Sequence, residues 1–156
     1  MSIDVRLLGL PDQPLIEGVS AELFDDPILP KSVIAFLADP RHIIIGALDG
    51  RALVGFVSAL EYYHPDKPPH LWINEVSTAS SHRRLGIASR MLTAAFEEGR
   101  KRGCVEAWVG TEHDNEAARR LYSSMAEAGQ PASFLMYEFD LTINARRSGR
   151  STPSAA

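Results

Sequence analysis

The sequence lacks several features that would assign a protein class at once. Its single cysteine, Cys104, allows no disulfide within the chain and fits a reducing compartment. The longest nearly unbroken apolar run, residues 52–60, is too short to cross a bilayer. The first residues do not show the basic segment and following apolar stretch of a signal peptide. These absences favour a cytoplasmic protein with no membrane partner.

An excess of positive charge is also missing. Lys and Arg number 16 against 20 Asp and Glu, and the formal net charge of −4 argues against a broad basic surface for nucleic acid. The 5 histidines show no spacing typical of metal ligands, and the cysteine stands alone, so no metal is expected. The balance is compatible with a cationic partner.

What is present is an ordinary composition for a soluble domain, 45% hydrophobic and 23% charged. The length allows one domain with a normal core, predicted for residues 1–141. Residues 142–156 are rich in Arg, Ser, Pro and Ala without an apolar pattern, and a disordered tail is expected there.

Strands and helices alternate along the predicted domain. Apolar runs predict strands at residues 3–8, 42–48, 52–60, 71–77, 104–109 and 134–141. The dipeptide Asp49-Gly50 is typical of a hairpin between the second and third of these. Short helices are expected within residues 18–37, and apolar spacing predicts longer ones at 85–102 and from Asp114 or Asn115 to the stop signal Gly129-Gln130-Pro131. This order indicates an α/β fold around a mixed sheet.

A loop rich in hydrogen-bond donors precedes the helix predicted at 85–102. Gly86 lets a ligand approach the backbone, Ala88 and Ser89 keep the first turn narrow, and Arg83 and Arg84 add positive charge. Because a helix N-terminus offers unpaired N–H groups and a favourable dipole, the loop suits a phosphate. A solvated basic loop leading into an amphipathic helix would explain the same residues.

The next predicted helix carries Asn115 and Tyr122, seven residues apart and so on one face. A tyrosine titrates near ~10 and a thiol near ~8.5, so a phenol at this position could protonate a leaving thiolate. A core aromatic and a simple helix cap are the alternative for these two residues.

Two motifs in this part of the chain resemble a known family. Residues 83–88, RRLGIA, match the (Gln/Arg)-x-x-Gly-x-(Gly/Ala) signature of the GNAT superfamily of N-acetyltransferases. Asn115, Ala118 and Leu121-Tyr122 match its Asn-x-x-Ala-x-x-Leu-Tyr helix. The resemblance extends over residues 42–140. It implies a GNAT-type mixed central sheet with helices on both faces, whose strands are splayed at the acetyl-CoA site.

The resemblance also implies how acetyl-CoA is held. Backbone groups of Val76 and Thr78 would pair with the pantetheine arm, an amide near Val76 would bind the thioester oxygen, and the amides of the loop would bind the pyrophosphate. The implied cofactor-binding residues are Val76, Thr78, Arg83, Arg84, Leu85, Gly86, Ile87, Ala88, Ser89 and Asn115.

The reaction requires an acid and a base, because an ammonium is not a nucleophile. Tyr122 is the implied acid. Glu75, in an otherwise apolar strand, is the first candidate for the base, acting directly or through a water, and such help is worth ~10²–10⁴ in rate. Glu112 and His113 are alternatives for the base, and each is also explained as a solvated loop residue.

A narrower similarity is to the aminoglycoside 3-N-acetyltransferases of this superfamily. It rests on residues 70–76, HLWINEV, and 82–88, HRRLGIA, with Glu75 where those enzymes carry an aspartate. Residues 123–133 replace a shorter turn. The similarity implies transfer to the 3-amino group of an aminoglycoside antibiotic. Since carboxylates hold a polycationic amine best, we expect four of them to face one cleft: Glu61, Glu75, Glu112 and Asp114.

Other acceptors and another class of protein remain open at this point. A polyamine, or the amine of a protein or peptide, would want similar charges. A domain that binds acyl-CoA without catalysis would need the phosphate loop but neither Glu75 nor Tyr122. The sequence also leaves open a homodimer.

Overall fold

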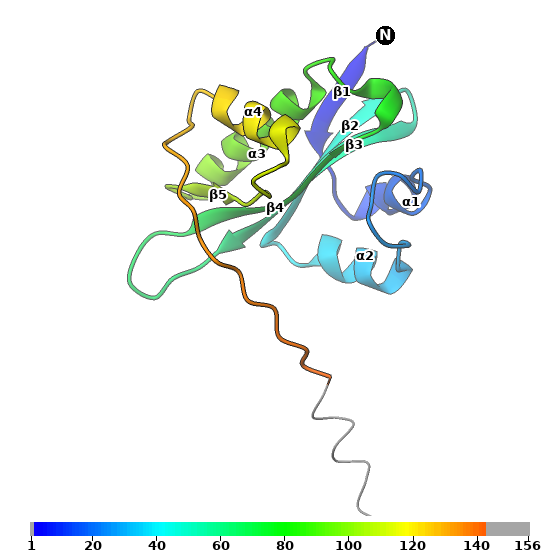
Figure 1. Ribbon diagram of the computed structural model, residues 1–156. Coiled ribbons are helices and arrows are strands. Elements are labelled where there is room, and N and C mark those ends of the chain that lie inside the picture. Colours follow the sequence, from blue (N-terminus) through cyan, green and yellow to red (C-terminus); the bar gives the residue numbers. More distant parts are fainter. Residues whose placement is uncertain (1, 143–156) are drawn as a thin grey trace, which may run out of the picture.

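The computed structural model describes residues 2–142 (Figure 1). The tail expected at 142–156 lies, apart from Thr142, outside these residues. In chain order the elements are β1 (Ile3–Leu7), η1 (Leu10–Asp12), α1 (Gln13–Glu17), α2 (Pro30–Ala38), β2 (His42–Asp49), β3 (Ala52–Tyr62), β4 (His70–Thr78), η2 (Ser80–His82), α3 (Ile87–Lys101), β5 (Ala107–Val109) and α4 (Glu116–Ser124).

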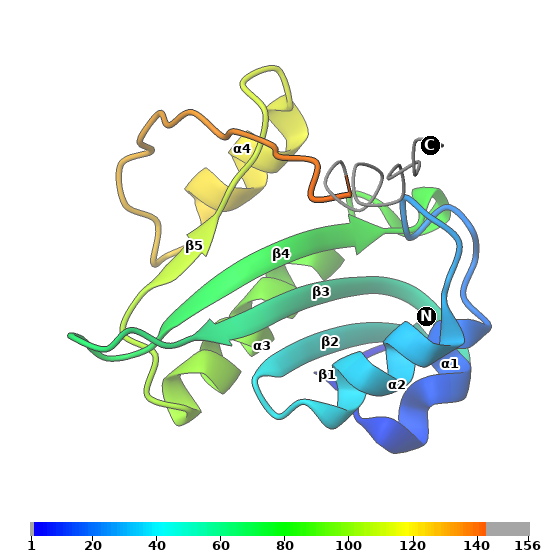
Figure 2. The ribbon, with the colours of Figure 1, turned by 90° about the horizontal axis from the view of Figure 1, so that it is seen from below.

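The five strands form one mixed sheet in the order β1-β2-β3-β4-β5. The first four are antiparallel neighbours, while β5 runs parallel to β4 because α3 crosses between them. Figure 2 shows α1 and α2 in front of the sheet and α3 behind it. The predicted α/β fold, with a mixed sheet and helices on both faces, is confirmed.

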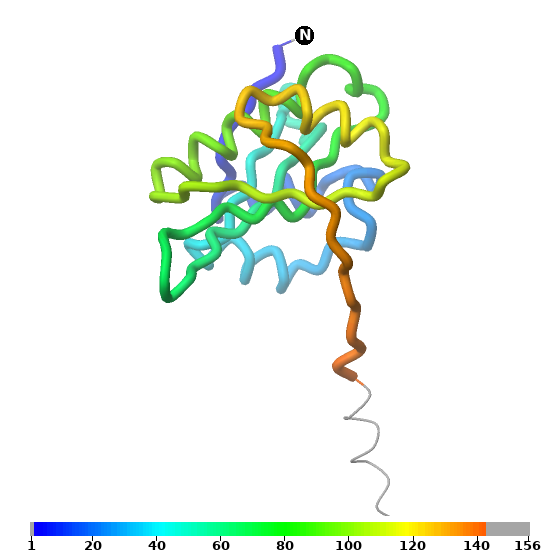
Figure 3. The backbone as a smooth tube through the Cα atoms, turned by 60° about the vertical axis from the view of Figure 1, so that its left-hand side comes forward, coloured from blue at the N-terminus to red at the C-terminus, as the bar shows by residue number. Residues whose placement is uncertain are grey.

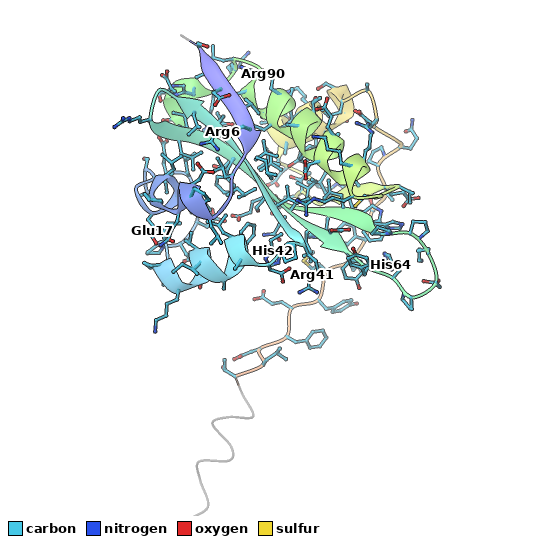
Figure 4. The ribbon with its side chains drawn as sticks, turned by 180° about the vertical axis from the view of Figure 1, so that it is seen from behind. Arg6, Glu17, Arg41, His42, His64 and Arg90 are labelled. Atoms are coloured by element: carbon cyan, nitrogen blue, oxygen red, sulfur yellow. The ribbon has the colours of Figure 1, made fainter. Side chains whose placement is uncertain are left out.

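Apolar side chains from the sheet and α3 make the core. Met91, Leu92 and Ala95 of α3 are fully buried, and fully burying a side chain such as Leu or Met is worth about 1.5–3 kcal/mol. On the other face Phe24 stacks on Phe56 of β3 with ring centroids 4.1 Å apart. Near the start of α3, the Arg90 guanidinium donates to the Ile3 carbonyl of β1 at 2.8 Å, and Figure 4 shows Arg90 beside that strand. The helix is thus held across the sheet.

The long helix begins later than the apolar spacing predicts. Its first residue is Ile87 rather than Leu85, because Arg84 and Gly86 take left-handed backbone angles, φ 61° and 72°, which a right-handed helix excludes. The cap of α4 is Asn115, whose side-chain oxygen accepts the Ala118 amide at 3.1 Å.

The last predicted strand is wrong. Residues 134–141 form neither strand nor helix, and Figure 3 shows this part of the chain running away from the sheet. A pattern of apolar residues favours a strand only where a neighbouring strand supplies partners. The fifth strand is also shorter than the predicted 104–109, since only Ala107–Val109 pair with β4.

Candidate active site

The loop before α3 exposes a run of backbone donors. Arg84 and Gly86 both have positive φ, the kind of alternation that turns successive amides toward one anion. Within residues 2–142, the amides of residues 84–89 have no hydrogen-bond acceptor. The loop is exposed, and Ile87 at its end is buried and anchors it to the core. The geometry expected for a phosphate cradle is therefore present, with a 15-residue helix behind it.

Three contacts hold this loop against the rest of the molecule. The Arg83 Nε donates to the Thr78 carbonyl at 3.2 Å, and the His82 ring lies 3.3 Å from the Asp49 carboxylate. The Ser80 amide donates to Oε2 of Glu22 at 3.1 Å, a contact that lowers the pKa of Glu22. Glu22 comes from the segment between α1 and α2, and no sequence motif pointed to it.

The strands are splayed beside the loop. β5 pairs with β4 only as far as Ile73, opposite Val109, whereas β4 continues to Thr78. On its other edge β4 stays paired with β3, with Val76 opposite Val57 and Thr78 opposite Gly55. The edge of β4 that faces away from β3 is thus open beyond Ile73. This is the splay that the resemblance implied, and within residues 2–142 no strand lies beside the backbone groups of Val76 and Thr78 on that side.

A bulge in β4 sets the direction of Glu75. Ser58 faces Glu75 across the strand pair and Ala59 faces Ile73, so Asn74 is the extra residue. The bulge therefore comes directly before Glu75. Glu75 is half-buried, and its pKa is raised first by burial and then by the nearby carboxylate of Asp25, while the Ser58 hydroxyl partly offsets both.

Tyr122 lies on α4 and is half-buried. Burial raises the pKa of its phenol, and the carboxylate of Glu112 raises it further. The group is therefore a neutral phenol across the physiological range, the form that can donate a proton. Asn115, seven residues earlier, is exposed and uses its side-chain oxygen to cap the same helix.

The structure separates the four carboxylates that were expected to face one cleft. Glu61 pairs with Leu71 near the start of β4 and is buried, where it accepts from the Tyr63 hydroxyl at 2.8 Å and lies 3.9 Å from Arg102. It stands apart from Glu75, which is near the other end of the strand. The reason is the length of β4, along which each residue advances about 3.3 Å.

The other two predicted carboxylates lie in the exposed loop between β5 and α4. Glu112 is the carboxylate that raises the pKa of Tyr122, and Asp114 is exposed beside the α4 cap. His113, an alternative base, is exposed in the same loop. The carboxylate that raises the pKa of Glu75 is Asp25, and sequence reasoning missed it. The only feature of the sequence that pointed to Asp25 was the pair Asp25-Asp26, which lies in a region where apolar residues follow neither helical nor strand spacing.

Comparison with known proteins agrees with this geometry. A model of the acetyltransferase (GNAT) family matches residues 10–126, three quarters of the chain, so the chain belongs to this family. It is an N-acetyltransferase. The search of curated proteins finds no match. None of the helices within residues 2–142 is long and apolar enough to pass through a membrane.

Solved structures share the fold. An aminoglycoside acetyltransferase from an uncultured soil metagenomic sample is similar with a TM-score of 0.75 and 23% identity, over 89% of this chain and 100% of that one. A ribosomal-protein-alanine N-acetyltransferase from Brucella melitensis gives 0.69 and 22%, over 88% and 100%. AAC(6')-Iy, in complex with the bisubstrate analogue CoA-S-monomethyl-acetylneamine, gives 0.73 and 16%, over 90% and 100%. At these identities the likeness is one of fold.

Proposed function

We propose that the protein transfers the acetyl group of acetyl-CoA to a primary amine of an aminoglycoside, at its 3-amino group. The observation that carries this proposal is the run of amides at residues 84–89, unpaired within residues 2–142 and next to the open edge of the strand that bears Glu75. A pyrophosphate bound at the loop would direct the pantetheine arm along that edge, so that the acetyl thioester and a reacting amine would meet beside Glu75. In the proposal this activity takes place in a reducing compartment such as the cytoplasm, and the single cysteine is compatible with that.

The donor is bound by backbone groups. In the proposal the amides of residues 84–89 hold the pyrophosphate, and Arg83 and Arg84 add charge at the same place. The pantetheine arm extends along β4 and pairs with Val76 and Thr78 in place of the missing strand. This arrangement supports acyl-CoA as the co-substrate, and the structure of AAC(6')-Iy with a CoA-containing analogue is consistent with it.

The chemistry is a direct attack within a ternary complex. The ammonium of the acceptor first gives a proton to Glu75, directly or through a water, and the free amine then attacks the thioester carbonyl. An amide near Val76 stabilises the oxyanion. The intermediate collapses by breaking its C–S bond, and Tyr122 donates a proton to the departing thiolate of CoA. As the acceptor nitrogen becomes the amide it gives up its second proton, which returns through water to Tyr122, while Glu75 releases the first to solvent. A raised pKa makes Glu75 a stronger base, and a neutral phenol makes Tyr122 a usable acid.

The acceptor side favours a cation. Glu75 and Asp25 bring two carboxylates together, and an ammonium between them would relieve the repulsion that raises the pKa of Glu75. Aminoglycosides carry several ammonium groups, and two of the fold relatives described above are aminoglycoside acetyltransferases by name. One of these two relatives is of the 6' type. The relatives therefore support an aminoglycoside as the acceptor without supporting the 3-amino position.

The test is an acceptor screen with purified protein. Release of the CoA thiol is followed with gentamicin-type drugs, spermidine and an alanine-initiated peptide, and the acetylated drug is examined by NMR. Turnover of the drug with acetylation at the 3-amino nitrogen supports the proposal. Acetylation at a 6'-amino group would correct the position alone, and turnover of only spermidine or peptide would overturn the aminoglycoside.

A second candidate is acetylation of a protein N-terminus, favoured by the ribosomal-protein-alanine N-acetyltransferase among the fold relatives. The alanine peptide in the same screen decides between them. A non-catalytic acyl-CoA-binding module is tested separately with Glu75→Gln and Tyr122→Phe. If both variants bind CoA and neither changes any acetyl transfer, the roles proposed for these two residues are wrong.

A further inference from the structure

Ser58, in the middle of β3, carries a buried hydroxyl without a hydrogen-bond partner among residues 2–142. The residue is 5% exposed, and its Oγ makes no hydrogen bond there. It is the only polar side chain in the buried stretch 53–59 of β3. Burying a hydroxyl without a partner is unfavourable, so this group is not explained by packing alone. A partner is therefore to be sought among the side chains on the same face of the sheet.

Glu75 is the side chain directly opposite. Ser58 and Glu75 face each other across the β3–β4 pair, and opposite residues of antiparallel strands place their Cβ atoms about 4.5–5.5 Å apart on one face. The bulge in β4 creates this pair. Without its extra residue, Asn74 would stand opposite Ser58, and Glu75 would turn to the other face of the sheet. The Ser58 hydroxyl is close enough to lower the pKa of Glu75, although the two groups do not meet the geometry of a hydrogen bond.

The other polar neighbour of Glu75 on this face is Asp25, which as a carboxylate accepts hydrogen bonds and does not donate them. Phe24 stacks on Phe56, which precedes Ser58 by two residues in β3 and so shares its face. Figure 2 shows α1 and α2, which flank Phe24 and Asp25 in the chain, on that side of the sheet. Among the charged groups of residues 2–142, Asp25 is the one that raises the pKa of Glu75. Ser58 can therefore donate to Glu75 where Asp25 cannot.

We propose that Ser58 is a positioning residue for the base: its hydroxyl donates to one carboxylate oxygen of Glu75 and leaves the other oxygen free to take the proton of the acceptor. This inference rests on the role given to Glu75 in the proposed function. Rotation of the two side chains about their own bonds closes the contact, because they already face each other. The hydrogen bond fixes the direction of the carboxylate and favours its ionised form, which is the form that accepts a proton.

The first measurement is made on the Glu75 carboxyl itself, so it does not depend on the acceptor. The carboxyl is titrated by carbon-13 NMR in the full chain, and its signal is assigned with Glu75→Gln. In Ser58→Ala the pKa of Glu75 should rise by about one pH unit, because a hydrogen bond to the charged form is lost. In Ser58→Thr, which keeps a hydroxyl, the pKa should stay near the wild-type value. Ser77→Ala is the matched control, since Ser77 is half-buried on the same face two residues after Glu75, and it should leave that pKa unchanged.

The second measurement is the pH profile of kcat/KM with an amine that is turned over. A base with a higher pKa loses its ionised form at higher pH, so the acid limb should move to higher pH in Ser58→Ala. At a pH below the wild-type pKa the rate should fall about tenfold, and Ser58→Thr should restore it. A residue that only filled space would give the reverse order, because alanine is smaller than serine and threonine is larger.

Three outcomes overturn the proposal. An unchanged pKa of Glu75 in Ser58→Ala means that the hydroxyl does not hold the carboxylate. An equal rise in Ser58→Ala and Ser77→Ala means that Ser58 has no special position. A rise in Ser58→Ala without any movement of the kcat/KM profile means that the contact does not serve a base. Failure of the aminoglycoside as acceptor is a separate result, because it would leave the NMR titration and the profile with another amine unchanged.

Discussion

The proposed donor side and the proposed acceptor side of the site are built in different ways. The donor side is one continuous piece of chain, residues 80–89, whose geometry follows from two left-handed residues and the start of α3. The acceptor side brings together Asp25 and Glu75, from the segment before α2 and from β4, while Tyr122 comes from α4. A local structure can be specified by local sequence, while a pair drawn from two distant segments depends on their packing. The two sides should therefore respond differently to substitution.

Removal of the base should have the largest effect and should leave donor binding intact. Glu75→Gln keeps the size of the side chain but cannot accept the proton of the ammonium, so kcat should fall by about 10²–10⁴. The KM for acetyl-CoA should stay within twofold. Steady-state kinetics with both substrates varied measures the two effects. The matched control is Glu61→Gln, which removes a carboxylate from the neighbouring strand and should cost stability rather than turnover. Equal losses of kcat in both variants would contradict the role of Glu75.

A change in the donor loop should give the opposite result. Gly86→Ala places a Cβ at φ 72°, and the left-handed region costs such a residue about 1–2 kcal/mol, so the free loop would relax and the KM for acetyl-CoA should rise about 5–30-fold. The KM for the amine should change little. Gly103→Ala is the control, because Gly103 has φ 86° at the other end of α3 and open space around it. It should lower Tm by a similar amount without any change in the KM for acetyl-CoA.

The acceptor side can be examined through Asp25 and pH. Asp25→Asn removes one carboxylate of the pair and should raise the KM for a polycationic amine about 3–10-fold. The Asp25 carboxylate raises the pKa of Glu75, so its removal lets Glu75 ionise at lower pH. The acid limb of the kcat/KM profile should then move to lower pH. Asp26→Asn is the control, and a profile that shifts equally in both variants would mean that Asp25 has no special position.

The smallest expected effect is at the contact that joins the two sides. Glu22 belongs to the same segment as Asp25 but accepts from Ser80 beside the donor loop. Glu22→Ala should raise the KM for acetyl-CoA about threefold, in line with the loss of one exposed hydrogen bond, and should leave the KM for the amine unchanged. Glu17→Ala, an exposed carboxylate on α1, serves as the control. A rise in the KM for the amine instead would place Glu22 with the acceptor.

Much of the fold followed from local signals. The hairpin at Asp49-Gly50, the apolar face of α3 and the Asn115 cap are each set by residues within a few positions of one another, and all three are present in the structure. The start of α3 was misjudged by two residues because apolar spacing does not report the backbone angles of Arg84 and Gly86. The prediction of a strand at 134–141 was wrong for a different reason. A strand needs a second strand to pair with, and residues close in sequence do not supply one.

The candidate site divides along the same line. Val76, Thr78 and the amides of the loop were expected from the family resemblance. In the structure Val76 and Thr78 lie on the part of β4 beyond its pairing with β5, and the loop follows η2 after that strand. Asp25 could not be predicted, because its approach to Glu75 depends on how the segment before α2 packs on Phe56. Glu61 was misassigned because alternation along a strand tells which face a side chain takes but not which end of the site it occupies.

By itself the sequence determined the alternation of helices and strands and the position of the glycine-containing loop at the start of α3. These depend on hydrogen bonds and steric limits that act over a few residues. Only the tertiary structure decided which carboxylate stands beside Glu75, where β4 and β5 part, and that residues 134–141 lie uncovered. Those features depend on contacts between segments far apart in the chain. The free energies of such contacts cannot be inferred from the pattern of residues in one short segment.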